Sequence, residues 1–217
     1  MRLLTVVGAR PQFIKAAVVS RAIEATGKIQ ETLIHSGQHY DHAMSKVFFE
    51  ELGIPEPEIH LGVGSGSHAV QTGRIMIELE EHCMELRPDI VLVYGDTNTT
   101  LAACLVAAKL SIPLAHVEAG LRSFNRAMPE EVNRIVTDSL STHLFAPTRA
   151  ASANLAREGV DADRIHLVGD VMFDAALAFR ERALAVSSIR QQVGLGAGAP
   201  YVLATIHRAA NTDSPER

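Results

Sequence analysis

The regular alternation of short aliphatic runs with longer helical patterns most constrains the fold of this chain. The runs are rich in valine, leucine and isoleucine, and they lie at residues 3–7, 31–35, 90–94, 113–117, 143–146, 164–168 and 201–206. Helical patterns separate most of them. Strand, helix and strand repeated in this way predict an α/β fold with a doubly wound parallel sheet, covered by helices on both faces.

Two of the helical patterns are clear enough to assign in detail. From about Ser67, the expected N-cap, to Leu86, apolar positions recur at steps of three and four residues, which predicts an amphipathic helix. The run at residues 98–110 is rich in small residues and predicts a helix packed tightly on the sheet. The apolar positions of the first helix are Val70, Gly73, Ile77, Leu79, Cys83 and Leu86.

A domain boundary is expected within residues 171–185. We predict an N-terminal domain over residues 1–170, followed at 171–217 by a connecting helix and the first strand of an incomplete second domain. The helical stretch at 173–194 leads through a glycine-rich loop to the aliphatic run at 201–206, which we expect to be that strand.

Composition narrows the functional class. Hydrophobic residues make up 47% of 217 residues, which is enough for a substantial core. The net charge of −5 argues against a nucleic-acid or anionic-membrane surface. The start of the chain lacks a signal-peptide pattern, and no apolar run is long enough to span a bilayer. Cys83 and Cys104 are expected to be buried free thiols. We therefore expect a cytoplasmic protein with no nucleic-acid or membrane partner.

Unusual polar residues follow the predicted strands, at the edge where a doubly wound sheet binds its ligands. Chance would scatter such residues over both edges, so their convergence predicts a functional site. In chain order they are Gly8, Arg10 and Lys15, then Gln38 and His39, then Gly95, Asp96 and Thr97, then Glu118 and Arg122, and finally His207 and Arg208.

The first of these segments, GARPQFIK, combines free backbone N–H groups at a helix start with Arg10 and Lys15. That combination predicts an anion site, although an ordinary strand-to-helix turn would look similar. It is not a dinucleotide fingerprint, because Arg10 occupies a position that would require glycine. In HSGQHYDH the histidine spacing matches no standard zinc pattern, which favours polar residues lining a pocket, and we expect no metal.

The carboxylates differ in how easily a structural role would explain them. Asp96 or Thr97 could be a helix N-cap. Glu130 and Glu131 could begin a helix, where acidic residues are favoured. Glu118 ends a buried strand, so its carboxylate must find partners there. From these residues alone, both a structural role and a role in handling protons stay open for Asp96, Glu130 and Glu131.

The chain resembles the non-hydrolysing UDP-N-acetylglucosamine 2-epimerases. This resemblance implies two Rossmann-like domains, arranged as in a glycosyltransferase of the B type, with a UDP-sugar bound between them and no cofactor. We also expect a homodimer. The matching segments are GARPQFIK, SGQHYD, VYGDTNTTLA, HVEAGLRS, MPEEVNR, Thr137–Asp138, Gly169–Asp170 and ATIHRAANTD.

The resemblance also implies roles for individual residues. Gln38 and His39 resemble a region that binds a second, regulatory substrate molecule in some members of the family. Ala210 departs from the glutamate that many members carry after the His-Arg pair. The implied catalytic residues are Asp96, Glu118, Glu130 and His207. The implied substrate-binding residues are Arg10, Lys15, Asp96, Glu118 and His207.

The implied reaction interconverts UDP-N-acetylglucosamine and UDP-N-acetylmannosamine, supplying activated sugar for cell-surface polysaccharide. It would proceed by elimination of UDP and re-addition with inversion at C-2. Two alternatives remain open within enzymes, namely a 2-epimerase acting on a modified UDP-sugar and a glycosyltransferase. A sugar-nucleotide-binding fragment without catalysis is a third alternative, although a pure binder would not need three acids near strand ends.

Overall fold

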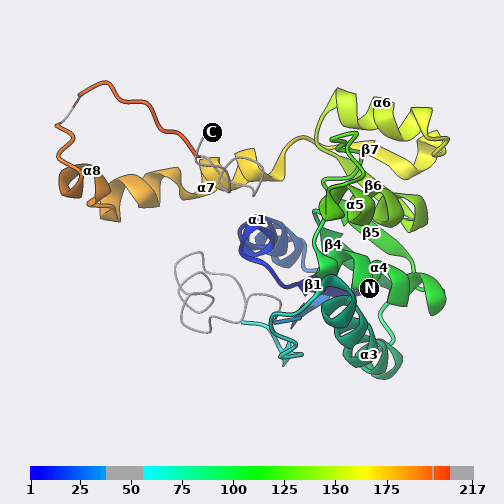
Figure 1. Ribbon diagram of the computed structural model, residues 1–217. Helices are drawn as coiled ribbons and strands as arrows, with labels where there is room; N and C mark the ends of the chain where they lie inside the picture. Colours follow the sequence, from blue (N-terminus) through cyan, green and yellow to red (C-terminus); the bar gives the residue numbers. More distant parts are fainter. Residues whose placement is uncertain (38–55, 197, 206–217) are drawn as a thin grey trace. The chain divides into compact units, whose positions relative to one another are not determined.

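The computed structural model describes residues 1–37, 56–196 and 198–205 (Figure 1). It divides into two compact units, Met1–Phe179 and Arg180–Arg217. The first unit contains the sheet and is the subject of the following paragraphs. The expected assignment of residues 1–170 and 171–217 to separate domains stays a prediction.

The first unit is built on a seven-stranded sheet in which all neighbouring strands pair in parallel. Its order is β3-β2-β1-β4-β5-β6-β7. The order therefore runs outward from β1 in one direction and from β4 in the other, which confirms the predicted doubly wound fold. The strands are β1 (Arg2–Val7), β2 (Gln30–His35), β3 (Ile59–His60), β4 (Ile90–Tyr94), β5 (Leu114–Val117), β6 (His143–Ala146) and β7 (Ile165–Leu167).

Helices cover both faces of this sheet. Leu3 on β1 faces the core beneath α1, whereas Leu4 faces the core beneath α3 and α4, because alternate strand residues point to opposite faces. Among the described residues, no helix combines the length and apolar character needed to cross a bilayer. The helices that begin in the first unit are α1 (Arg10–Thr26), α3 (His68–Leu86), α4 (Asn98–Lys109), α5 (Pro129–Leu140), α6 (Arg149–Arg157), the 3-10 turn η1 (Ala162–Arg164) and α7 (Val171–Val186). The short helix α8 (Ile189–Gln192) belongs to the second unit.

The predicted apolar face of α3 was partly wrong. Its buried residues are Gln71, Ile75, Leu79 and Cys83, whereas Val70 and Ile77 are 46% and 64% exposed. A buried glutamine breaks the hydrophobic pattern, yet its amide is satisfied, since it donates to the Gly64 carbonyl at 2.8 Å and accepts from Asn98 at 2.8 Å. Ser67 does occupy the N-cap position, but its side chain makes no capping hydrogen bond.

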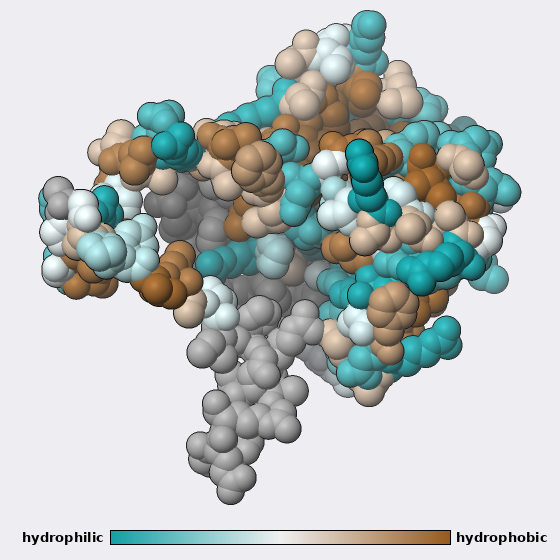
Figure 2. Space-filling view, turned by 90° about the horizontal axis from the view of Figure 1, so that it is seen from above, coloured by the Kyte–Doolittle hydropathy of each residue, from teal (hydrophilic) through white to brown (hydrophobic). Residues whose placement is uncertain are grey.

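The aliphatic run at 201–206 does not form the expected strand over the residues that are described, 201–205. Tyr201, Val202 and Leu203 are exposed there. A strand needs a neighbour for its backbone hydrogen bonds, and residues 201–205 pair with none of the described strands. The predicted helical stretch at 173–194 is interrupted between α7 and α8. Leu184 and Val186 are exposed in this segment. Figure 2 shows apolar residues at the surface of the molecule.

Two neighbouring substitutions on α3 test which face is buried. Leu79→Ala removes a side chain with no exposed surface and should lower the free energy of unfolding by about 2–5 kcal/mol. The matched control Ile77→Ala removes an exposed side chain and should change it by less than about 0.5 kcal/mol. Chemical denaturation of both variants measures the difference. Equal losses would contradict the helix orientation.

Candidate active site

The turn between β1 and α1 is fastened to the turn between β4 and α4 by Gln12, which sequence reasoning missed. The buried Gln12 carbonyl oxygen accepts from the N–H groups of Gly8 and Ala9 at 2.8 and 3.0 Å. Its amide nitrogen donates to the Tyr94 carbonyl at 2.8 Å and to the Thr100 hydroxyl at 3.0 Å. These two turns lie where the strand order reverses, so Gln12 braces the two sides of that crevice.

Lys15 and Glu118 form an ion pair at the same place. Their side chains are only 9% and 16% exposed, so this charged pair is largely shielded from solvent. Gly95 lies directly beside them, because a Cβ atom built on it would sit 3.3 Å from the Glu118 carboxylate and 3.4 Å from the Lys15 ammonium. The close approach of these three residues shows that a side chain from α1, the turn after β4 and the residue after β5 meet at one edge of the sheet.

The backbone of Glu118 is itself unusual. Its φ of 73° lies in the left-handed region, which costs a residue with a Cβ atom roughly 1–2 kcal/mol. Such strain persists only where the surrounding structure enforces it, and it is common at functional sites. The N–H of the next residue, Ala119, donates to the Phe145 carbonyl at 3.2 Å, which helps hold the conformation.

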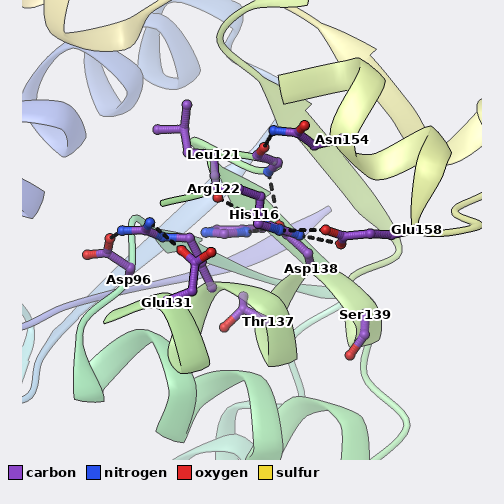
Figure 3. Close-up of polar contacts among 12 residues, drawn as sticks. Asp96, His116, Leu121, Arg122, Glu131, Thr137, Asp138, Ser139, Asn154 and Glu158 are labelled. Carbon is purple, nitrogen blue, oxygen red and sulfur yellow. Dashed lines mark hydrogen bonds and ion pairs between the residues drawn. The ribbon is translucent and has the colours of Figure 1, made fainter. Parts of the chain in front are cut away.

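Asp96 is held from two sides by α5 (Figure 3). Its carboxylate forms an ion pair with Arg134, and its backbone carbonyl accepts from the Asn133 amide at 2.8 Å. The helix N-cap of α4 is Thr97, whose hydroxyl accepts from the Thr100 N–H at 3.3 Å. The Asp96 carboxylate is therefore not used as the cap and remains one-third exposed.

Glu131 anchors the loop that follows β5. Its buried carboxylate accepts from the N–H groups of Ser123 and Phe124 at 2.9 and 2.8 Å, and pairs with Arg134 at 2.7 Å. Burial alone would raise the pKa of Glu131, but these hydrogen bonds and the Arg134 charge lower it overall. Glu130 is exposed, and no hydrogen bond or ion pair joins it to the residues that are described. The adjacent glutamates thus have different environments.

Arg122, expected to accompany Glu118 at the edge of the sheet, is instead held in a polar network with Asp138 and Glu158 (Figure 3). Its guanidinium donates to both oxygens of Glu158 at 2.8 and 2.6 Å, and it pairs with Asp138 at 2.7 Å. The same Asp138 carboxylate contacts His116 Nδ1 at 2.7 Å. Sequence reasoning gave neither His116 nor Asp138 a role, because their partners are distant in the chain.

The remaining candidates are only partly placed. Arg10 is exposed at the start of α1, and Pro11 lies in the first turn of that helix as expected. Gln38, His39 and His207 lie outside the described residues, as do most of the histidines weighed as possible metal ligands. The catalytic and binding roles of all these residues stay predictions.

Comparison with known proteins now identifies the family. The family model described as UDP-N-acetylglucosamine 2-epimerase matches residues 21–217. The chain belongs to the UDP-N-acetylglucosamine 2-epimerase family. It is 52% identical, over its whole length, to the UDP-2,3-diacetamido-2,3-dideoxy-D-glucuronate 2-epimerase of Pseudomonas aeruginosa, and covers 60% of that protein. It is 47% identical to the UDP-N-acetylglucosamine 2-epimerase of Methanocaldococcus jannaschii and covers 59% of it.

A solved structure agrees with this assignment. The crystal structure of the M. jannaschii enzyme in complex with UDP-N-acetylglucosamine and UDP superimposes on the whole chain with a TM-score of 0.90. The chain covers 59% of that structure. The fold is therefore that of this epimerase family, and the chain spans about 60% of the length of the relatives that it matches.

The Glu131 anchor makes a prediction about acid stability. Because the pKa of Glu131 is lowered on folding, its contribution to stability is present above the pKa of the unfolded chain and is lost as the pH falls through the folded pKa. Glu131→Gln should lower the free energy of unfolding by about 1–3 kcal/mol near neutral pH. The carboxylate accepts hydrogen bonds through two oxygens, whereas the amide that replaces it has only one acceptor oxygen. The substitution should also flatten the fall in unfolding free energy between about pH 6 and pH 3.

Denaturation across that pH range measures both effects. Glu130→Gln is the matched control, because it neutralises the adjacent exposed carboxylate, and it should leave stability near neutral pH almost unchanged. A stability loss in Glu130→Gln equal to that in Glu131→Gln would contradict the anchoring role.

Proposed function

We propose that this protein interconverts UDP-N-acetylglucosamine and UDP-N-acetylmannosamine by elimination and re-addition of UDP. The observation that carries the proposal is the Lys15–Glu118 pair, placed beside Gly95 at the switch point of the sheet in a member of this epimerase family. Ligands of doubly wound sheets bind at that point. A relative with the same fold has been solved with UDP-N-acetylglucosamine and UDP bound.

The chemistry explains the need for several acids. The proton on C-2 of the sugar is not next to a carbonyl, so it is difficult to remove directly. If a base takes it while the C-1 to diphosphate oxygen bond breaks, the products are UDP and an unsaturated sugar. Return of a proton to the opposite face of C-2, with re-formation of the bond between C-1 and oxygen, gives the epimer. This order of steps requires proton-transfer groups on both faces of the sugar at C-2, and it involves no net oxidation.

Asp96, Glu118 and Glu130 are the groups that we assign to proton transfer. The Lys15 ammonium lies against Glu118, so a proton accepted by Glu118 would release the Lys15 charge to stabilise the departing diphosphate. Arg10 and His207 would supply further positive charge or hydrogen bonds to that group. Asp96 is oriented by Arg134 and Asn133, which fits a residue that must hold one position during the reaction.

A second candidate substrate is a UDP-linked diacetamido uronic acid. Its support is the 52% identity to a P. aeruginosa protein that carries that activity in its name. Such a sugar adds a carboxylate, whose recognition would require a cation beyond those assigned to the diphosphate. Parallel assays with both UDP-sugars decide between the candidates.

Hydrogen exchange with solvent tests the elimination mechanism. The chain is joined to the remaining part of the M. jannaschii relative and incubated with UDP-N-acetylglucosamine in heavy water. The C-2 position of the product should carry deuterium, because the proton that returns comes from a group in exchange with solvent. NMR at C-2 measures this. Epimerised product without deuterium would exclude elimination, and binding without any epimerisation would favour the non-catalytic alternative.

Replacement of single carboxylates tests the assigned residues. Asp96→Asn, Glu118→Gln and Glu130→Gln should each lower turnover by roughly 100-fold or more, the usual contribution of a general acid or base. Glu81→Gln, on the exposed face of α3, is the control and should retain full turnover. Steady-state kinetics of the joined protein measure the losses. Normal turnover in Glu130→Gln would return that residue to a role in starting α5.

A further inference from the structure

A buried polar network lies directly behind the proposed catalytic edge, and its central residue is His116 on β5. The imidazole is completely buried. Its Nδ1 lies 2.7 Å from the Asp138 carboxylate, and its Nε2 lies 2.7 Å from the Gly95 carbonyl oxygen. His116 therefore connects α5 to the residue that immediately precedes Asp96 (Figure 3).

The partners of His116 determine how many protons the ring carries. A backbone carbonyl can only accept a hydrogen bond, so Nε2 must donate to Gly95. Asp138 also accepts from the Gly120 N–H at 3.0 Å and pairs with Arg122 at 2.7 Å. Burial would raise the pKa of Asp138, but His116 and Arg122 together lower it, so this carboxylate is an acceptor as well. Nδ1 must then donate, whereas a neutral imidazole has only one N–H.

The charges of the surrounding elements agree with a cation at this position. Two carboxylates, Asp138 from α5 and Glu158 at the end of α6, face the Arg122 guanidinium, which is one positive charge. Glu158 retains 40% exposure and is screened by water, whereas Asp138 is only 1% exposed, so a positive charge on His116 would add to the compensation of the buried Asp138 carboxylate. Burial raises the pKa of the nearby Cys104 thiol on α4 to about 12, so this group adds no negative charge. A neutral His116 would leave the Arg122 guanidinium as the charged partner of Asp138 and would place an unprotonated Nδ1 against the carboxylate oxygen.

We propose that His116 carries a proton on both ring nitrogens and is a positioning residue, which fixes the Gly95–Asp96 turn and, through Asp138, the loop that follows Glu118. This inference rests on the proposed function for the roles of Asp96 and Glu118. The ring bridges the two loops that carry those carboxylates. Without it, the Gly95 carbonyl loses the donor that β5 supplies, and Asp138 keeps its contacts with Arg122 and Gly120.

Ring NMR tests the protonation directly and needs no catalysis. The 217-residue chain is labelled with ¹⁵N in its histidine rings, and two-bond proton–nitrogen correlations are recorded near neutral pH. His116→Gln identifies the His116 signals, and His143→Gln, on the adjacent strand β6, is the matched control for the assignment. Both nitrogens of His116 should have shifts of protonated nitrogen. An unprotonated nitrogen in this ring would overturn the proposal.

Kinetics then test the positioning role in the chain joined to the remaining part of the M. jannaschii relative. His116→Gln should lower kcat by about 100-fold with KM little changed, since a displacement of about 1 Å at reacting groups is enough for such a loss. His143→Gln should be unaffected. A folded His116→Gln variant with normal kcat would overturn the positioning role.

If His116→Gln does not fold, Asp138→Asn provides the second variant. It removes the carboxylate that holds the second proton, so the His116 ring should become singly protonated and kcat should fall. A doubly protonated ring in Asp138→Asn would overturn the assigned partnership. Absence of epimerase activity in the unsubstituted joined protein would instead contradict the proposed function, and the ring measurement would still stand.

Discussion

The parallel pairing of β1 with β4 is the constraint on which the rest of the site depends. Each strand continues into a helix on a different face of the sheet, so the two turns lie at the switch point where doubly wound sheets bind their ligands. β5 pairs with the other side of β4 and brings Glu118 to the same edge. The Lys15–Glu118 pair spans this arrangement, from the helix after β1 to the end of β5. Residues 103 positions apart thus meet only because three strands pair in this order.

Local features of the sequence were sufficient for much of this arrangement. β4 and β6 begin and end where their aliphatic runs do, and Thr97 caps α4, because strand pattern and capping depend on neighbours in the chain. The two-residue strand β3 and the break between α7 and α8 left no comparable signal. The predicted apolar face of α3 was wrong at Val70 and Ile77, since tertiary contacts of Gln71 decide which side of that helix is buried.

Long-range partners also decide which polar residues are structural. Arg122 and Glu118 are four residues apart, and the sequence placed both of them at the same edge of the sheet. Glu118 faces Lys15, whereas Arg122 is committed to Asp138 and Glu158. A buried charge in a dry position needs such compensation, so the partners supplied by α5 and α6 determine the direction in which each side chain points. One sequence cannot show those partners, and the role of Gln12 was missed for the same reason.

α5 explains why the site can combine strained backbone with buried charge. Its buried or half-buried residues Glu131, Arg134 and Asp138 recur at steps of three and four, which is the spacing of one helix face. A face of that kind is normally apolar and packs against the sheet. Here it carries charge, and its residues bind the segments that lead to the edge of the sheet. Glu131 holds the loop after β5, Arg134 holds Asp96, and Asp138 holds His116. One rigid helix supplies all three anchors. A displacement of α5 would therefore move the Asp96 turn and the loop after Glu118 together, which preserves the distance between their carboxylates.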